Sequence, residues 1–110
     1  MNVGEVWIVD FPYEDDPTKS KIRPCIIIDI EDELLVLSIK VTTHESRDEY
    51  DVPIFKWREA NLLNPSYARV SKVLLFNKES FIKKCGTLSE MDFENIKRAF
   101  VRYYSSSRKY

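Results

Sequence analysis

Residues 4–12 read GEVWIVDFP and residues 23–29 read RPCIIID, with a charged stretch between them. The first stretch alternates apolar and polar residues and is rich in β-formers, so it predicts a strand over 5–11. The second contains an unbroken apolar run, which indicates a strand over 23–30 that is buried on both faces. Arg23 therefore stands where a polar loop meets a buried strand, and the proline after it restricts its backbone to extended conformations. Such a position can present a fixed cation to a phosphate group.

The remainder of the chain predicts further short strands. Apolar or alternating runs predict strands over 34–41, 50–54, 68–76 and 82–87. The charged turn Glu31-Asp32-Glu33 is short, so the strands on either side of it should form an antiparallel hairpin. Residues 57–62 are expected to form a short helix that ends before Asn64-Pro65.

The clearest element comes last in the chain. Phe93, Ile96, Phe100 and Tyr103 recur at helical spacing, and Ser89 with Asp92 resembles a capping box. We therefore expect an amphipathic helix over about 90–104. Since the connections are too short for parallel crossovers, the predicted fold class is mainly β: a small, strongly bent antiparallel barrel with a C-terminal helix.

Length and composition indicate one domain over 1–110 with an ordinary hydrophobic core. No apolar run approaches the roughly 20 residues that a membrane span needs, and no secretory signal is recognisable, so a cytoplasmic protein is expected, with no membrane partner. The net charge of −1 gives no global nucleic-acid signature. A local cationic site remains possible, since Lys19, Lys21 and Arg23 end the first loop.

Cysteine and histidine usage argues against metal or disulfide chemistry. Cys25 and Cys85 lie far apart in sequence, which favours buried, reduced thiols. His44 is the single histidine, and no close Cys/His pair exists for a structural zinc site. No cofactor is expected.

Candidate catalytic groups cluster at one end of the predicted hairpin. Pairing of the two strands brings the start of one beside the end of the other, so Arg23 and Thr42 should be neighbours. Transesterification of RNA needs few protein groups, because the ribose 2′-hydroxyl is the nucleophile. A guanidinium offers permanent bidentate donors to phosphorane oxygens, and a threonine hydroxyl adds another donor. His44 would be the conventional acid or base.

The sequence at 4–11, the Arg23-Pro24 pair before Cys-Ile-Ile-Ile, and the Thr42-Thr43 pair at a strand end together resemble the MazF/PemK family. These proteins are the toxins of bacterial type II toxin–antitoxin modules. The resemblance extends over nearly the whole chain, including the strand at 68–73 and Gly-Thr-Leu-Ser at 86–89. It implies an SH3-like barrel, a homodimer, and an mRNA interferase that cleaves single-stranded RNA sequence-specifically without metal. It also implies neutralisation by a cognate antitoxin that occupies the RNA site.

Carried over to this chain, the family's catalytic arginine falls on Arg23 and its catalytic threonine on Thr42. The products implied are a 2′,3′-cyclic phosphate and a 5′-hydroxyl. Thr43 and His44 are nearby accessory candidates for RNA binding. Lys21 and Lys40 are candidate phosphate contacts, although solvated lysines are the commoner explanation.

Several alternatives stay open at this level. Arg23 could instead form an ion pair with Asp15 or Asp16, and these acids depart from the family pattern and could repel RNA. His44 could be no more than an exposed loop residue. The same fold is compatible with a non-catalytic SH3-like binding module or with a gyrase-poisoning toxin.

Overall fold

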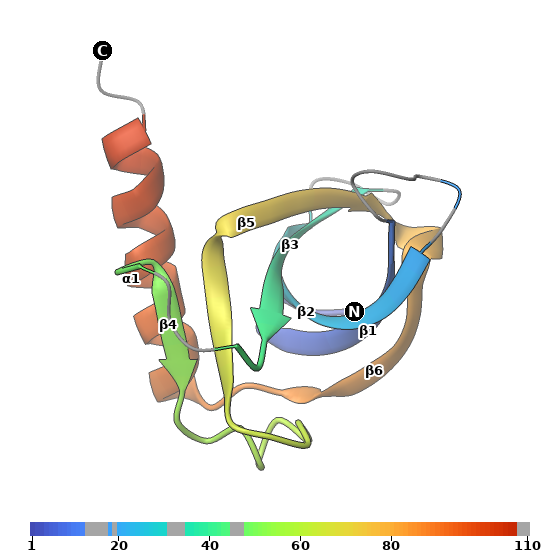
Figure 1. Cartoon of the computed structure of the whole chain (residues 1–110), viewed down its shortest axis with the longest axis horizontal. Coiled ribbons are helices and arrows are strands. Elements are labelled where there is room, and N and C mark those ends of the chain that lie inside the picture. The colour runs from blue at the N-terminus through green and yellow to red at the C-terminus, as the bar shows by residue number, and fades with distance from the viewer. Residues whose placement is uncertain (13–17, 19, 31–34, 45–47, 108–110) are drawn as a thin grey trace.

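The computed structural model describes residues 1–12, 18, 20–30, 35–44 and 48–107. It contains a strongly curved sheet with one long helix beside it (Figure 1). The elements in chain order are β1 (Glu5–Pro12), β2 (Ser20–Ile30), β3 (Leu35–Thr42), β4 (Asp51–Ile54), β5 (Ser66–Asn77), the 3₁₀ turn η1 (Lys78–Ser80), β6 (Phe81–Thr87) and α1 (Glu90–Ser107).

The strands form one six-stranded sheet with the order β4-β5-β3-β2-β1-β6. All pairings between neighbours are antiparallel. The sheet curls into a barrel-like ring, while α1 lies outside this ring next to β4 (Figure 1). The predicted fold class, a mainly β antiparallel structure with a C-terminal helix, is confirmed.

The core has two parts because β2 is buried on both of its faces, as its unbroken apolar run predicts. Cys25 and Ile27 belong to one cluster, with partners from β1, β3, β5 and β6. Ile26, between them, belongs to the other cluster, which includes Ile96 of α1. Successive strand residues point to opposite faces, so one strand serves both clusters.

The predicted hairpin is confirmed: β2 and β3 pair with Cys25 opposite Lys40 and Ile26 opposite Ile39. The amphipathic helix is also confirmed, and it runs to Ser107, beyond the predicted end. Its N-terminus is capped by Ser89, whose Oγ accepts the Asp92 amide at 3.2 Å.

The short helix predicted over 57–62 is wrong. This stretch is a series of turns, in which the Asn61 amide donates to the Arg58 carbonyl at 3.0 Å and the Leu62 amide to the Trp57 carbonyl at 3.0 Å. Asn61 has a φ of 59°, in the left-handed region, which is incompatible with a continuing α-helix.

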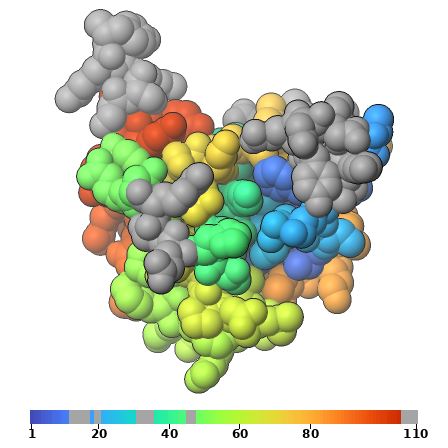
Figure 2. Space-filling model, viewed as in Figure 1, coloured from blue at the N-terminus to red at the C-terminus, as the bar shows by residue number. Residues whose placement is uncertain are grey.

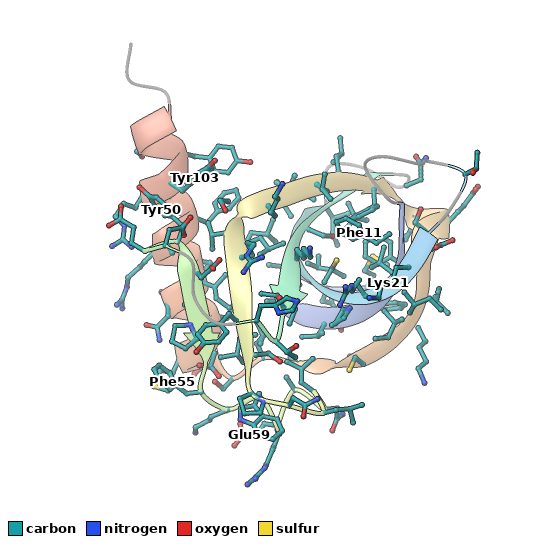
Figure 3. All side chains as sticks on the ribbon, in the orientation of Figure 1. Phe11, Lys21, Tyr50, Phe55, Glu59 and Tyr103 are labelled. Atoms are coloured by element: carbon teal, nitrogen blue, oxygen red, sulfur yellow. The ribbon has the colours of Figure 1, made fainter. Side chains whose placement is uncertain are left out.

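Besides the backbone pairing of β4 with β5, side-chain contacts hold β4 and Tyr50, the residue before it. Arg69 of β5 forms a buried, two-pronged ion pair with Asp51 of β4, with N···O distances of 3.1 and 3.2 Å. Tyr103 of α1 meets Tyr50 edge-on at 4.8 Å between ring centroids (Figure 3). No helix in the described part of the chain combines the length and apolar character that a membrane span requires.

Candidate functional site

A cavity of about 500 Å³ lies where the start of β2, the end of β3, β6 and the segment after β4 come together. Figure 2 shows the green end of β3 and the blue start of β2 above the yellow-green segment that follows β4. The described lining residues are Ile8, Arg23, Pro24, Val41, Thr42, Thr43, Asn61, Leu62, Leu63, Asn64, Ser66, Lys83, Lys84 and Cys85.

Arg23 and Thr42 both line this cavity. The β2–β3 register explains why: the pairing ends with Cys25 opposite Lys40, and Arg23 and Thr42 lie two residues beyond this pair at the same end of the two strands. On its other side Arg23 is paired with Val9 of β1, so its backbone is held between two strands. Its side chain is half-buried and forms no ion pair with any carboxylate of the described residues.

Thr42 is buried, with 4% of its surface exposed, yet it borders the cavity. Its Oγ1 accepts the backbone N–H of His44 at 3.2 Å. A hydroxyl has one donor and two acceptor sites, so the Thr42 proton is left to donate to a ligand. The bond from His44 also fixes the rotation of the Thr42 side chain.

The cavity is electropositive. Three of its lining residues, Arg23, Lys83 and Lys84, are cationic, and none of the described lining residues is acidic. Lys84 is partly neutralised by Glu5, whose Oε2 lies 3.0 Å from its Nζ. Burial alone would raise the pKa of Glu5, but hydrogen bonds from Trp7, Asn2 and Lys84 outweigh burial and lower it to about 2.

Of the other predicted site residues, one lines the cavity and three do not. Thr43 lines the cavity with Thr42. His44 is exposed and does not line the cavity, and neither do Lys21 and Lys40. Lys21 is exposed on β2, opposite Phe11 (Figure 3). The Nζ of Lys40 lies 5.7 Å from the centre of the Phe11 ring. The alternative pairing of Arg23 with Asp15 or Asp16 lies outside the described residues.

Residues 2–104 match the model of the family described as PemK-like, MazF-like toxins of type II toxin–antitoxin systems. The chain belongs to this family. No curated protein sequence matches it.

Solved structures share the fold of this family member. An endoribonuclease in complex with its cognate antitoxin, from a mycobacterial species, aligns with a TM-score of 0.76 and 14% identity over 96% of this chain and 95% of that one. The Mycobacterium tuberculosis toxin MazF-mt6 aligns with a TM-score of 0.68 and 17% identity, over 90% of this chain and 96% of that one. An endoribonuclease from a mycobacterial species aligns with a TM-score of 0.71 and 14% identity, over 96% of this chain and 94% of that one.

Sequence reasoning missed part of the site of this MazF-like chain, namely Lys83 and Lys84 on β6 and Asn61 and Asn64 after β4. The two lysines reach the cavity through the pairing of β1 with β6, which sets Ile8 opposite Lys83 and Trp7 opposite Lys84. That pairing joins the first and last strands, and no local pattern predicts it. The adjacent lysines before Gly86 were the one available signal.

Both thiols are free; Cys25 is buried as predicted, whereas Cys85 is only partly buried. Burial raises the pKa of Cys25 to about 12 and also raises the pKa of Cys85, which lines the cavity. Both therefore stay protonated and weakly nucleophilic at neutral pH. Among the described residues, no group of three or more His, Cys, Asp or Glu side chains is arranged to hold a metal ion.

Proposed function

We propose that this protein is an endoribonuclease toxin that cleaves single-stranded RNA by attack of a ribose 2′-hydroxyl on the adjacent phosphorus. The observation that carries the proposal is the meeting of Arg23 and Thr42 in one cationic cavity of a MazF-like chain. In this reaction the new bond joins the 2′-oxygen to phosphorus, and the bond from phosphorus to the 5′-oxygen breaks. The products are a 2′,3′-cyclic phosphate and a 5′-hydroxyl.

Arg23 is proposed to bind the phosphorane, in which negative charge builds up on the non-bridging oxygens. Its guanidinium stays protonated and supplies two parallel N–H donors, so it is a charge stabiliser rather than a base. Pairing with Val9 of β1 and the adjacent Pro24 fix its backbone before substrate arrives. No donor then has to be reorganised as the charge develops.

Thr42 is proposed to donate its hydroxyl proton to a second phosphate oxygen, with its Oγ1 oriented by the His44 amide. Lys83 would contact a neighbouring phosphate, since it lines the cavity and pairs with no described carboxylate. The described lining contains neither a carboxylate nor an imidazole, so the 2′-hydroxyl proton is proposed to leave through solvent. Water likewise returns a proton to the departing 5′-oxygen.

We further propose that a cognate antitoxin covers this cavity and that the toxin is a homodimer. The antitoxin proposal is supported by the similar fold of an endoribonuclease solved in complex with its cognate antitoxin. An acidic or amide-rich segment would suit the cationic lining.

The test is incubation with a long single-stranded RNA in the presence of a chelator, followed by mapping of both new ends. Wild type is expected to cut at a defined sequence and leave the cyclic phosphate, and Arg23→Ala is expected to lose at least about 10² in kcat. Arg23→Lys keeps the positive charge but loses the two parallel N–H donors of the guanidinium, so it should recover little of the cleavage activity. Undiminished cleavage by Arg23→Ala would refute the assignment.

Two other outcomes distinguish the alternatives. Arrest of DNA supercoiling with intact RNA would indicate a gyrase poison on this fold. Peptide binding that survives replacement of both Arg23 and Thr42 would indicate a plain SH3-like module.

A further inference from the structure

One side of the cavity is made by residues 61–64, which belong to the segment 55–65 between β4 and β5. We call this segment the wall segment. Asn64 is exposed, and Leu63 is 89% exposed although it is a large apolar residue. Both line the cavity that holds Arg23 and Thr42. These two side chains are therefore placed to meet a ligand rather than to stabilise the core.

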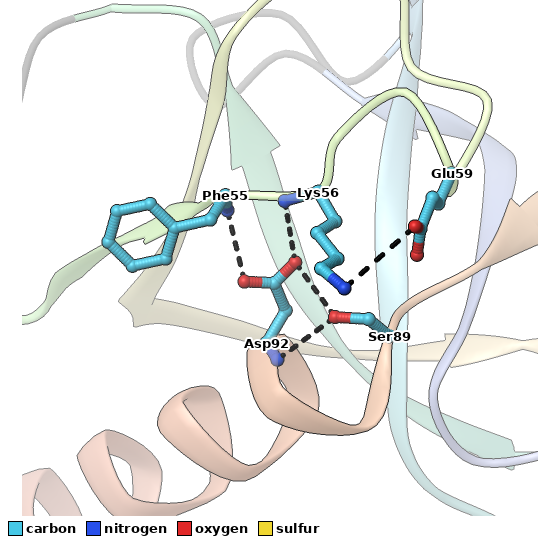
Figure 4. Close-up of polar contacts among 5 residues, drawn as sticks. All are labelled: Phe55, Lys56, Glu59, Ser89 and Asp92. Carbon is cyan, nitrogen blue, oxygen red and sulfur yellow. Dashed lines mark hydrogen bonds and ion pairs between the residues drawn. The ribbon is translucent and has the colours of Figure 1, made fainter.

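The start of the wall segment is held by a buried carboxylate of α1 (Figure 4). Asp92 has 0% exposure, and its Oδ1 and Oδ2 accept the backbone N–H groups of Phe55 at 3.0 Å and Lys56 at 2.9 Å. Ser89 Oγ donates to the same carboxylate at 3.1 Å. In a capping box the third helical residue bonds back to its own helix. Here the carboxylate instead binds backbone 36 and 37 residues away.

The middle and end of the wall segment are held as well. Asn61 Nδ2 donates to the Cys85 carbonyl at 3.0 Å, and the Cys85 thiol donates to the Asn61 carbonyl at 3.2 Å. Ser66 Oγ donates to the Asn64 carbonyl at 2.7 Å. The wall segment is thus fixed at three points by groups outside it, which is the arrangement expected of a pre-organised binding surface.

From this geometry we infer that the wall segment reads a base next to the scissile phosphate, with Asn64 as the specificity-determining residue and Asp92 as its positioning residue. The inference rests on the proposed RNA cleavage. The Asn64 amide offers a donor and an acceptor side by side, the pattern that pairs with a base edge. Leu63 offers an apolar surface to a base face. Single-stranded RNA exposes both edges and faces of its bases.

Asp92 can affect a ligand in the cavity only indirectly, through the wall segment, since it is buried and does not line the cavity. Replacing it with Asn keeps one carbonyl acceptor but puts an NH₂ group against one of the two amides. The start of the wall segment then loses one of its bonds, and Asn64 loses its fixed distance from Arg23. Base preference should fall while the phosphate-binding groups stay intact.

The experiment compares four full-length proteins: wild type, Asn64→Ala, Asp92→Asn and Ile96→Val. Ile96 is fully buried one turn after Asp92, so Ile96→Val loosens the packing of the helix on the core, which includes Ala60 and Leu62, but leaves the hydrogen bonds from Asp92 to Phe55 and Lys56 in place. Each protein is incubated with a randomised pool of single-stranded RNA, the cut ends are sequenced, and the sequences retained by binding are sequenced separately. Tm, kcat and KM are measured for each, on the RNA that wild type prefers.

Asn64→Ala and Asp92→Asn should both flatten the preference at one position beside the cut, with about a tenfold loss in the ratio of kcat/KM for preferred over disfavoured RNA. Ile96→Val should keep the wild-type preference at a similarly lowered Tm. Wild-type preference in Asn64→Ala, or in a folded Asp92→Asn, would overturn the inference.

The RNA sequences retained by binding distinguish failure of this inference from failure of the proposed nuclease activity. A wild type that selects sequences without cutting contradicts the nuclease, and the wall segment is then judged by whether the two variants flatten the bound sequences. A wild type that neither cuts nor selects overturns both.

Discussion

Glu5 of β1 and Lys84 of β6 are joined by a 3.0 Å ion pair, and Lys84 lines the cavity that also holds Arg23. The Glu5 side chain is 8% exposed and the Lys84 side chain 47%. Glu5 also accepts the Trp7 indole N–H and the Asn2 backbone N–H, each at 2.9 Å. One carboxylate thus ties the N-terminus to the strand that closes the site.

Glu5→Gln is predicted to destabilise the protein at pH 7 by up to about 3 kcal/mol, from a pKa of about 2 against an ordinary 4.5. Because the folded state lowers this pKa, Glu5 stabilises the protein fully above pH 4.5, and its contribution disappears as the pH falls toward 2. The difference between variant and wild type should therefore shrink over that range. Urea unfolding at pH 7, 4 and 2.5 measures it.

Glu94→Gln is the matched control. Glu94 pairs with Lys97 at 2.9 Å, but both side chains are about half exposed on α1, so water screens the pair. Its loss should leave stability almost unchanged at every pH. A Glu5→Gln difference that stayed constant between pH 7 and 2.5 would contradict the role of ionised Glu5.

Thr42→Val tests whether the hydroxyl acts as a donor. Valine keeps the shape of threonine, so the backbone should stay in place, but the donor to the phosphate oxygen is gone. We expect kcat to fall by about 10² to 10³ and KM to change little, since such donors act mainly in the transition state. Thr42→Ser, which keeps the hydroxyl, should retain most activity. The rate of single-turnover cleavage of a defined RNA is measured for wild type, Thr42→Val and Thr42→Ser. Equal rates for Thr42→Val and wild type would exclude the hydroxyl from catalysis.

Lys83→Ala is predicted to weaken RNA binding through one phosphate contact. For single-stranded nucleic acid, the logarithm of the binding constant falls by about 0.7 per unit of log salt concentration for each phosphate contact. The slope of this plot should therefore become shallower by about 0.7 in Lys83→Ala. Lys78→Ala is the control, because Lys78 is exposed and precedes β6 but does not line the cavity. The slope is measured from binding isotherms between 50 and 300 mM salt, which are roughly the range where this effect is resolved. Parallel slopes for wild type and Lys83→Ala would remove Lys83 from the RNA site.

What the sequence predicted depended on how local the determining contacts are. Arg23 and Thr42 meet because β2 and β3 are adjacent in the chain and joined by a short turn, so the strand pattern was enough to place them together. Lys83 enters the cavity through the pairing of β1 with β6, which are far apart in sequence. No periodicity within either strand reveals that pairing.

The prediction of a helix over 57–62 was wrong for the same reason: contacts with residues distant in sequence determine the structure there. Local propensity favoured a helix, but Asp92 holds the amides of Phe55 and Lys56, and Asn61 is held by Cys85. These long-range bonds outweigh a helical preference of a few tenths of a kcal/mol per residue. Ser89 and Asp92 were recognised as a helix start, whereas the second use of Asp92 needs coordinates to be seen.

Gly86→Ala is predicted to damage both stability and the cavity, because β6 passes very close to the wall segment at this residue. A Cβ on Gly86 would lie 2.4 Å from the carbonyl oxygen of Ala60 and 2.6 Å from its carbonyl carbon, and backbone atoms cannot move aside cheaply. We expect a loss of about 1 to 3 kcal/mol, as for other overpacked sites, together with altered base preference as the wall segment shifts. Chemical denaturation and sequencing of the cut RNA ends measure the two effects.

Gly4→Ala provides the comparison for Gly86→Ala. Gly4 has a φ of 91°, so alanine there is strained, but its nearest contact would be the Phe93 ring at 3.4 Å, away from the cavity lining. The cost should be about 1 kcal/mol, from backbone conformation alone, with the cut sequence unchanged. If both variants lost stability and neither changed the cut sequence, contact between β6 and the wall segment would have only a structural role, since strain at Gly86 would then not reach the RNA.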